Sequence, residues 1–210
     1  ADLCESLNTD IHFISRGIGL DKRIGDKFLH PGPGYGGSCF PKDTIALSKI
    51  ALDNNVDLSI INNVISYNQN RKKSLIKKIN HILGNDIKDM SVAVLGLSFK
   101  PGTDDMRESP SLDLIPSLVE NVKEIKVYDP IAMDEASKYI KDVYYANNIE
   151  DCIEKVDVTI ILTEWSDFRT LSAHYLSKFM KGNIVIDFRN ALNPENFKIK
   201  NITLHQVGRG

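Results

Sequence analysis

Cysteine is scarce in this sequence, and its scarcity excludes two classes of protein. Only Cys4, Cys39 and Cys152 occur among 210 residues, and none of them is in CxxC spacing. A fold held together by disulfides uses a larger, even set of cysteines, and a zinc site uses closely spaced ones. We therefore expect neither a disulfide framework nor a metal site. Sparse, odd-numbered cysteine usage also favours a reducing, cytoplasmic location.

Long apolar runs are also missing. The longest, such as 158–162, have the length of a strand, whereas a membrane-spanning helix needs roughly 18 residues or more. Residues 1–5 have neither the basic region nor the apolar core of a signal peptide. The sequence therefore predicts no contact with a membrane.

Neither sign of charge dominates. The 26 lysines and arginines and the 28 aspartates and glutamates give a formal net charge of -2 and are mixed along the chain. Binding to the phosphate backbone of a nucleic acid requires a concentrated basic surface, which such mixing does not provide. With 42% hydrophobic residues, the sequence predicts a globular protein that does not bind nucleic acid.

Apolar periodicity divides the chain into a helical piece, residues 1–90, and an α/β domain, residues 91–210. In 58–83 apolar residues recur at intervals near three and four, which predicts an amphipathic helix that Gly84-Asn85-Asp86 ends. The rest of the first piece also has helical spacing, apart from a Gly/Pro-rich loop in 30–41. Because its first apolar residues already share one helical face, we expect residue 1 to lie partway through a helix.

Beyond residue 90 the pattern changes to short β-branched runs separated by amphipathic segments. These runs are 92–97, 125–128, 158–162 and 184–186. Such alternation predicts an α/β fold with a mainly parallel, doubly wound sheet. The helix over 58–83 is expected to lead into it.

The most informative segment is the loop 30–43, in which four glycines surround one cysteine. Its sequence is His30-Pro31-Gly32-Pro33-Gly34-Tyr35-Gly36-Gly37-Ser38-Cys39-Phe40-Pro41-Lys42-Asp43. Glycine lets a backbone approach a ligand closely and turn its amides toward an anion, so the loop suits a polar substrate beside a thiol. Gly32, Gly34 and Gly37 satisfy GxGxxG, but no buried strand precedes them, which excludes a dinucleotide fingerprint here.

The residues alone leave two interpretations of Cys39 open. Most free cysteines are small buried hydrophobes. However, Lys42 and a helix expected to start at Asp43-Thr44 would both stabilise the thiolate of a nucleophile. Asp43 has a plain interpretation of its own, as the N-cap of that helix.

Longer motifs resemble one enzyme family. Segment 34–43, preceded by Asp21-Lys22-Arg23-Ile24-Gly25 and Lys27-Phe28-Leu29, is similar to the substrate loop of the UDP-glucose 6-dehydrogenase branch of the UDP-glucose/GDP-mannose dehydrogenases. Segment 94–110 resembles the start of their UDP-binding domain, which is Rossmann-like. Comparable segments follow at Tyr128-Asp129-Pro130, Thr163-Glu164-Trp165 and Asp187-Phe188-Arg189. The resemblance covers essentially the whole chain.

The resemblance implies an NAD-dependent oxidoreductase that converts UDP-glucose to UDP-glucuronate, a step of polysaccharide biosynthesis. In that family a cysteine adds to the aldehyde intermediate, and the resulting thiohemiacetal is oxidised to a thioester that water hydrolyses. Cys39 matches this nucleophile, and Asp43 matches the aspartate that assists the water.

The resemblance also implies which residues contact substrate and cofactor. The substrate contacts are Arg23 (offered to the neighbouring subunit), His30, Pro31, Gly32, Pro33, Gly34, Tyr35, Gly36, Phe99, Lys100 and Arg189. The cofactor contacts are Cys39, Phe40, Pro41, Lys42 and Arg107. Arginine binds pyrophosphate oxygens well, although without the family match these cations would be interpreted as solvated surface charges.

Two parts of the family's enzymes have no counterpart in residues 1–210: the NAD-binding domain, with its strand-borne GxGxxG, and the early part of the central helix, with a catalytic lysine and an asparagine. We therefore expect a C-terminal part of a longer enzyme, inactive alone, whose NAD is bound mainly by the other part. A homodimer formed through the helical piece is also expected.

Two alternatives remain. The substrate could be another nucleotide sugar, UDP-N-acetylmannosamine or GDP-mannose, although the sequence around Cys39 and Arg23 favours UDP-glucose. The chain could instead be a non-catalytic nucleotide-binding module or a dimerisation scaffold. The run 92–97, followed by a strand that ends in Asp129, imitates half of a dinucleotide-binding fold, in which an acid meets the ribose. Against this, Phe99-Lys100-Pro101-Gly102 replaces the glycine-rich turn of that fold.

Overall fold

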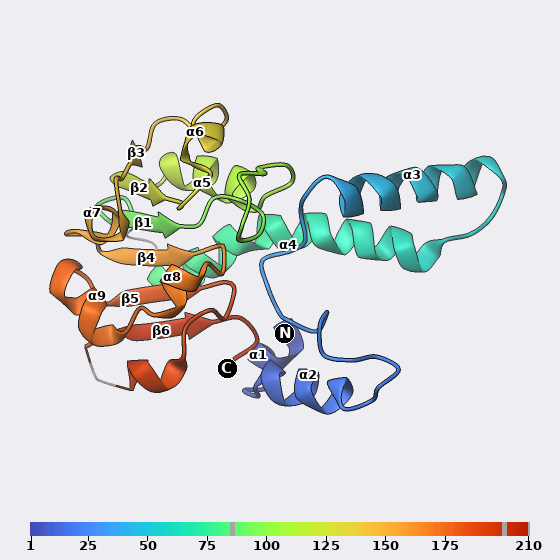
Figure 1. Cartoon of the computed structure of the whole chain (residues 1–210), viewed down its shortest axis with the longest axis horizontal. Coiled ribbons are helices and arrows are strands. Elements are labelled where there is room, and N and C mark those ends of the chain that lie inside the picture. Colours follow the sequence, from blue (N-terminus) through green and yellow to red (C-terminus); the bar gives the residue numbers. More distant parts are fainter. Residues whose placement is uncertain (85–86, 199–200, 210) are drawn as a thin grey trace.

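A six-stranded parallel sheet forms the centre of the computed structural model, which describes residues 1–84, 87–198 and 201–209 (Figure 1). The strands are β1 (Ser91–Leu95), β2 (Glu124–Tyr128), β3 (Tyr144–Tyr145), β4 (Val158–Ile161), β5 (Ile184–Asp187) and β6 (Thr203–Gln206). Their order is β3-β2-β1-β4-β5-β6, and every neighbouring pair is parallel. The predicted doubly wound α/β fold is confirmed, and the order reverses between β1 and β4.

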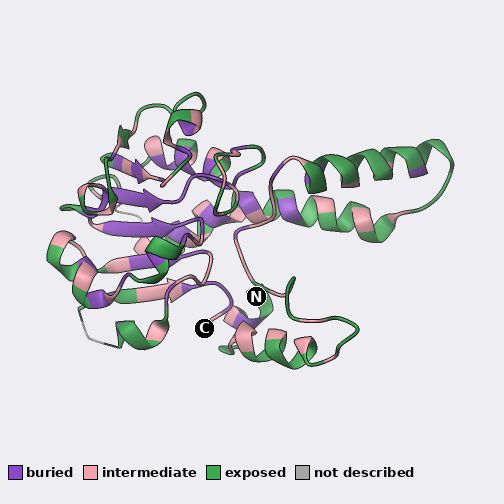
Figure 2. Cartoon of the chain, viewed as in Figure 1, coloured by how far each residue is buried: buried purple, intermediate pink, exposed green. Residues whose placement is uncertain are grey.

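Helices cover both faces of the sheet, because alternate residues of each strand point to opposite sides. Val92 and Val94 belong to one apolar core with α4 and α5, whereas Ala93 and Leu95 belong to a second core with α7 and α9. Figure 2 shows the strands as the most buried part of the chain. The helices of this part are α5 (Ser111–Val119), α6 (Met133–Ala136), α7 (Ile149–Ile153), α8 (Ser166–Arg169), α9 (Ala173–Phe179) and the 3₁₀ helix η1 (Pro194–Phe197).

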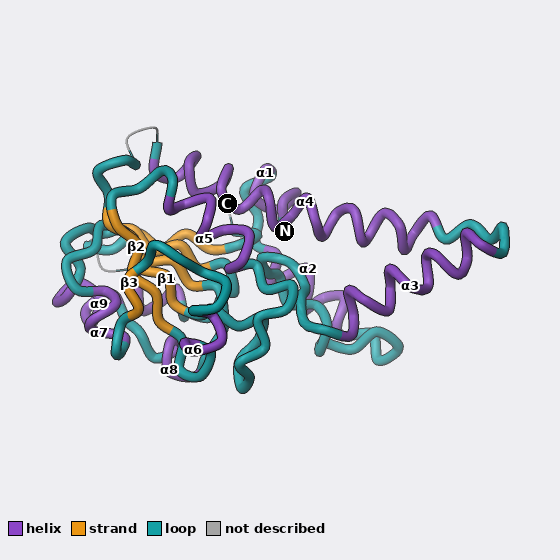
Figure 3. The backbone as a smooth tube through the Cα atoms, turned by 90° about the horizontal axis from the view of Figure 1, so that it is seen from above, coloured by secondary structure: helices purple, strands orange, loops and turns teal. Residues whose placement is uncertain are grey.

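Two long helices form a hairpin that extends away from the sheet (Figures 1 and 3). The helices before the sheet are α1 (Asp2–Ser6), α2 (Ile11–Gly19), α3 (Cys39–Asp53) and α4 (Ser59–Leu83). The predicted helix over 58–83 is confirmed as α4, and Leu75 and Ile79 near its end enter the core of the sheet. Gly84 ends the helix with φ of +77°; Asn85 and Asp86 lie outside the described residues.

The start of the chain packs against its end (Figure 1). The Gly208 amide donates to Glu5 Oε1 at 2.7 Å, and the Ile11 amide donates to the Gly208 carbonyl at 2.8 Å. Arg209 forms an ion pair with Asp10 at 3.1 Å. The helical part therefore contacts the part that holds the sheet both through α4 and through this junction. The division at residue 90 stays a prediction.

Helix α3 begins earlier than predicted. Its first residue is Cys39, with Ser38 as N-cap, so the start expected at Asp43-Thr44 is wrong. The Gly/Pro-rich loop expected over 30–41 therefore ends before residue 39. Pro41 lies in the first turn, where a helix does not use the backbone N–H that proline lacks.

We expect the anchoring of α4 to make a measurable contribution to stability. Ile79 is 0% exposed, so Ile79→Ala leaves a cavity in the core and lowers the free energy of unfolding by about 2–4 kcal/mol. Leu20, which follows α2, is 78% exposed, and Leu20→Ala changes it by less than about 1 kcal/mol. Urea unfolding of both variants measures the difference; equal losses would contradict the packing of α4 described above.

Candidate functional site

Cys39 is exposed, whereas Cys4 and Cys152 are buried. The interpretation of Cys39 as a buried hydrophobe is therefore wrong. Its thiol lies at the first residue of α3, where backbone N–H groups without helical partners favour a negative charge. Burial raises the pKa of the Cys152 thiol, which keeps that cysteine protonated and unreactive.

Asp43 lies one helical turn after Cys39. Residues four apart on a helix face the same side, with Cβ atoms roughly 5–6 Å apart. Asp43 is not an N-cap, because α3 begins four residues earlier, and that interpretation is wrong. Its carboxylate forms an ion pair with Lys42, and this hydrogen bond raises the pKa of Lys42. A thiol, a carboxylate and an ammonium thus share the first turns of α3.

The glycines of the loop are in close contact with the protein itself. Gly37 has φ of +84°, and a Cβ there would lie 2.7 Å from the Phe99 ring. A Cβ on Gly36 would lie 2.4 Å from the Glu108 carbonyl oxygen. The Gly37 amide donates to the Arg107 carbonyl at 2.8 Å. The glycines therefore allow the segment 30–38, here called the cysteine loop, to lie on the loop 96–110, which follows β1.

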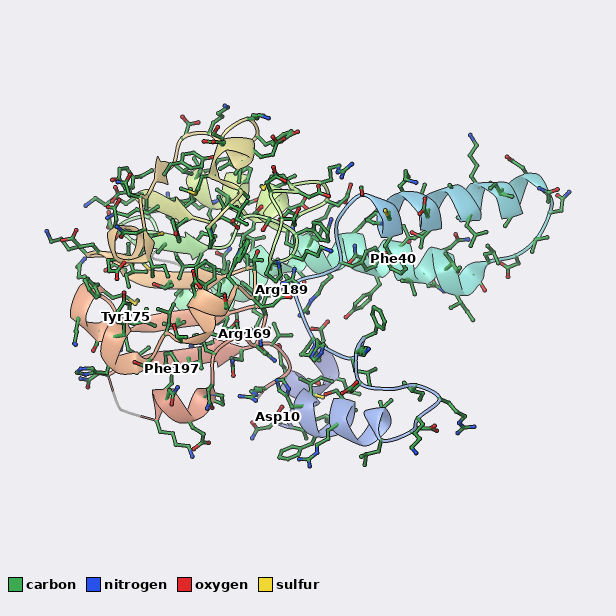
Figure 4. All side chains as sticks on the ribbon, viewed as in Figure 1. Asp10, Phe40, Arg169, Tyr175, Arg189 and Phe197 are labelled. Carbon is green, nitrogen blue, oxygen red and sulfur yellow. The ribbon has the colours of Figure 1, made fainter. Side chains whose placement is uncertain are left out.

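A cavity of about 1070 Å³ lies between the cysteine loop, α4 and the end of β5. The predicted residues that line it are His30, Gly32, Gly34, Tyr35, Phe40 and Arg189. The other lining residues are Ala1, Asp2, Phe28, Ile60, Asn63, Val64, Tyr67, Asn68 and Arg71. In Figure 4, Arg189 lies where the sheet meets α4, and Phe40 lies at the near end of the helical hairpin.

Arg189 is held in place from three sides. Nη2 donates to the Phe99 carbonyl at 2.7 Å, and Nε donates to the Leu162 carbonyl at 2.8 Å. Nε also lies 3.2 Å from the Glu164 carboxylate. Burial lowers the pKa of Arg189, an effect that Glu164 opposes, and a guanidinium remains charged at neutral pH. Nη1 lies beside Gly32 at the edge of the cavity, where it can meet an anion.

The remaining predicted residues do not line this cavity. They are Arg23, Pro31, Pro33, Gly36, Cys39, Pro41, Lys42, Asp43, Phe99, Lys100 and Arg107. Arg107 Nε donates a hydrogen bond to Asp105 Oδ1 at 2.9 Å, and the exposed Arg23 forms an ion pair with Asp21 at 2.6 Å. Lys100 Nζ lies 5.4 Å from the centre of the Phe99 ring. That ring lies against Gly37.

Sequence reasoning missed the polar residues of α4 at this site. Asn68 and Lys72 are buried, and they lie on the same face of the helix as Leu75 and Ile79. The signal was the spacing itself: two polar residues continue the three-and-four periodicity of the buried face. Polar side chains at buried positions require partners: the backbone of Tyr35 supplies them for Asn68, and the carboxylate of Glu108 supplies one for Lys72.

The α/β domain does not fit a nicotinamide dinucleotide. Asp129, at the end of β2, is 1% exposed, and its carboxylate accepts from the Leu97 amide at 2.8 Å and from Trp165 Nε1 at 3.2 Å. It is therefore not available to a ribose. The turn after β1 also has no glycine-rich fingerprint. Among the described residues no group of histidine, cysteine and carboxylate side chains could hold a metal ion, and no helix could span a membrane.

Two family models match the chain. The central domain of the UDP-glucose/GDP-mannose dehydrogenase family matches residues 1–70, and the UDP binding domain of the same family matches residues 93–194. The chain is 40% identical to a UDP-glucose 6-dehydrogenase of Rhizobium meliloti (strain 1021) over 209 residues, which are 100% of this chain and 48% of that protein.

Solved structures of similar proteins share the fold. A UDP-glucose dehydrogenase from the hyperthermophilic archaeon Pyrobaculum islandicum is 30% identical with a TM-score of 0.83, over 98% of this chain and 45% of that one. A UDP-D-ManNAc dehydrogenase from Pyrococcus horikoshii is 25% identical with a TM-score of 0.77, over 99% of this chain and 46% of that one. The chain spans about half the length of the curated relatives it matches.

Proposed function

Because the chain belongs to the UDP-glucose/GDP-mannose dehydrogenase family, we propose that it is the thiol-bearing, UDP-sugar-binding part of an NAD-dependent UDP-glucose 6-dehydrogenase. The complete enzyme oxidises UDP-glucose to UDP-glucuronate in two steps. The observation that carries the proposal is the exposed Cys39 thiol at the start of α3, with Asp43 one turn later. The identity to a UDP-glucose 6-dehydrogenase, 40%, favours this sugar over UDP-N-acetylmannosamine, whose dehydrogenase is 25% identical.

The residues of this chain would act on the aldehyde formed from the sugar alcohol. The Cys39 thiolate adds to the aldehyde carbon, and the resulting thiohemiacetal holds an intermediate that would otherwise escape. After the second oxidation the product is a thioester. Asp43 takes a proton from the attacking water, the carbon–sulfur bond breaks, and the sugar acid leaves with the thiolate regenerated. The family implies NAD as hydride acceptor, which residues outside this chain would mainly bind, with Arg107 and residues 39–42 of this chain as further contacts.

Charge and shape at the cavity support a UDP-sugar as ligand. Arg189 places one guanidinium nitrogen beside Gly32, and His30 and Tyr35 supply a polar and an aromatic wall. A guanidinium is well suited to a diphosphate. The Phe99 ring lies against Gly37 of the same loop, and Lys100 Nζ lies over that ring, which extends the site toward the end of β1.

Isothermal titration calorimetry tests the ligand. We expect the chain to bind UDP or UDP-glucose at least about tenfold more tightly than NAD, because the dinucleotide fingerprint is absent. Arg189→Met should weaken UDP binding by about tenfold or more, because it removes a charged hydrogen bond. Arg16→Met on α2 is the matched control and should leave it unchanged. Tighter binding of NAD than of UDP would overturn the assignment.

A homodimer through the helical part is also proposed. Helices α3 and α4 expose apolar side chains at Ile45, Ile50, Ile60 and Val64 along the hairpin that extends from the sheet. Exposed apolar patches of this kind mark interaction surfaces. Roles in polysaccharide biosynthesis and a cytoplasmic location stay predictions.

A further inference from the structure

Helix α4 holds the cysteine loop through the backbone of Tyr35. The Tyr35 amide donates to Asn68 Oδ1 at 2.9 Å, and Asn68 Nδ2 donates to the Tyr35 carbonyl at 3.0 Å. Asn68 is buried, and a Cβ on the neighbouring Gly34 would lie 2.9 Å from its Oδ1. One side chain of α4 therefore satisfies both backbone groups of a residue four positions before Cys39.

One turn further along α4, Lys72 joins the helix to the loop after β1. The Lys72 side chain is 5% exposed, and its Nζ lies 2.7 Å from the Glu108 carboxylate, which is 59% exposed. The stem of Lys72 packs beneath Gly34, where a Cβ would lie 3.4 Å from Cγ. A buried ammonium requires a partner of this kind, so the pair fixes Glu108 relative to α4.

The backbone of Glu108 in turn packs against the cysteine loop. It has φ of +54°, a left-handed conformation that is uncommon outside glycine, and its carbonyl oxygen covers Gly36. The next contact is the hydrogen bond from the Gly37 amide to the Arg107 carbonyl. Only Ser38 separates Gly37 from Cys39, so these contacts lie immediately before the start of α3.

We propose that Asn68, Lys72 and Glu108 form a clamp that positions Cys39 for its reaction. The inference rests on the proposed function, because the value of the clamp is the placement of the nucleophile. All three are positioning residues, since they hold the loop and not the thiol. The clamp also ties the cysteine loop to the segment that carries Phe99 and Arg107, so the two halves of the proposed site keep one relative position.

The first test is hydrogen exchange at the Tyr35 and Gly37 amides of this chain, resolved by NMR. Lys72→Met keeps the length of the stem and removes the pair with Glu108, and we expect both amides to exchange about tenfold faster. Glu108→Gln should have the same effect in a milder form, because the amide oxygen can still accept a hydrogen bond from the buried Lys72 ammonium but no longer neutralises its charge. Lys72→Arg retains the cation and should restore slow exchange.

The second test is the rate at which iodoacetamide alkylates Cys39, which reports the native chain well because the other two cysteines are buried. Lys72→Met should slow alkylation at neutral pH by about threefold or more, because the thiolate loses its fixed place at the first amides of α3. Lys72→Arg should restore the rate. A general loss of stability would not show this pattern of loss and rescue.

Lys78→Met is the matched control, because Lys78 is also on α4 and its ion pair with Glu5 lies away from the cysteine loop. It should change neither the two amides nor the alkylation rate. Unchanged exchange and alkylation in both Lys72→Met and Glu108→Gln would overturn the clamp. Neither readout requires turnover, so the clamp could fail while Cys39 remained the nucleophile. Conversely, undiminished turnover in Cys39→Ser would overturn the proposed function and leave the exchange and alkylation results for the Lys72 and Glu108 variants unaffected.

Discussion

Cys39→Ser in the complete enzyme stops the release of UDP-glucuronate while UDP-glucose still binds. A serine hydroxyl has a far higher pKa than a thiol, so at neutral pH it supplies almost no anion to add to the aldehyde. We expect the rate of acid formation to fall at least about a thousandfold, as is usual when a covalent nucleophile is removed. Binding survives because serine is nearly the same size as cysteine and the residues that line the cavity are unchanged.

The measurement is the rate of UDP-glucuronate formation with UDP-glucose and NAD saturating, together with calorimetry of UDP-glucose binding. Cys4→Ala is the control: Cys4 is buried in α1, away from the loop, and its replacement should leave the rate per folded enzyme unchanged. An undiminished rate in Cys39→Ser would show that no covalent intermediate forms there, and the glycines would then serve only to dock the loop on its neighbours.

The sheet could be predicted from the sequence where its strands are buried. Strands β1 and β4 are buried on both faces, so runs rich in valine and isoleucine, without regular polar alternation, mark them clearly. The edge strands left no such signal. β3 has two residues, and β6 has the sequence Thr203-Leu204-His205-Gln206, in which a single apolar residue is surrounded by polar ones. An edge strand needs less apolar surface, and its presence depends on the neighbour with which it pairs.

The candidate site could be predicted only in part, for a related reason. The composition of the cysteine loop singled out Cys39. The start of α3 was missed because Pro41 suggested that the loop continued, whereas proline is acceptable in the first turn of a helix. The partners of the loop could not be predicted. Asn68 and Glu108 lie far along the chain from Tyr35 and Gly36, and only the packing of α4 on the sheet brings them together.

Asp129 illustrates how one local pattern can support two structures. An acid at the end of the second strand suggested a ribose contact, as in a dinucleotide-binding fold. In this fold its carboxylate instead holds the turn after β1 and the indole of Trp165. Asp129 therefore stabilises the loop on which the cysteine loop rests. That it binds donors of the protein and not a ribose could not be predicted, because Trp165 lies far from Asp129 along the chain.

Asp43→Asn in the complete enzyme should let the thioester on Cys39 accumulate. The amide is nearly the same size as the carboxylate but cannot accept a proton from water, so hydrolysis slows by about 10²–10⁴-fold. The earlier steps do not require Asp43 and should continue through one turnover. Incubation with UDP-glucose and NAD, followed by acid quenching and intact mass spectrometry, should show the enzyme heavier by the bound sugar acyl group.

The structure separates this result from a loss of stability. Asp43 is exposed and forms an ion pair with the neighbouring Lys42, and an exposed ion pair contributes less than about 1 kcal/mol to folding. The position is not an N-cap, so asparagine has no capping role to lose or to fulfil. Asp53→Asn, at the other end of α3, is the matched control and should release acid at the normal rate. If Asp43→Asn also released acid normally, with no heavier species, water would be activated by another group and Asp43 would serve only as the partner of Lys42.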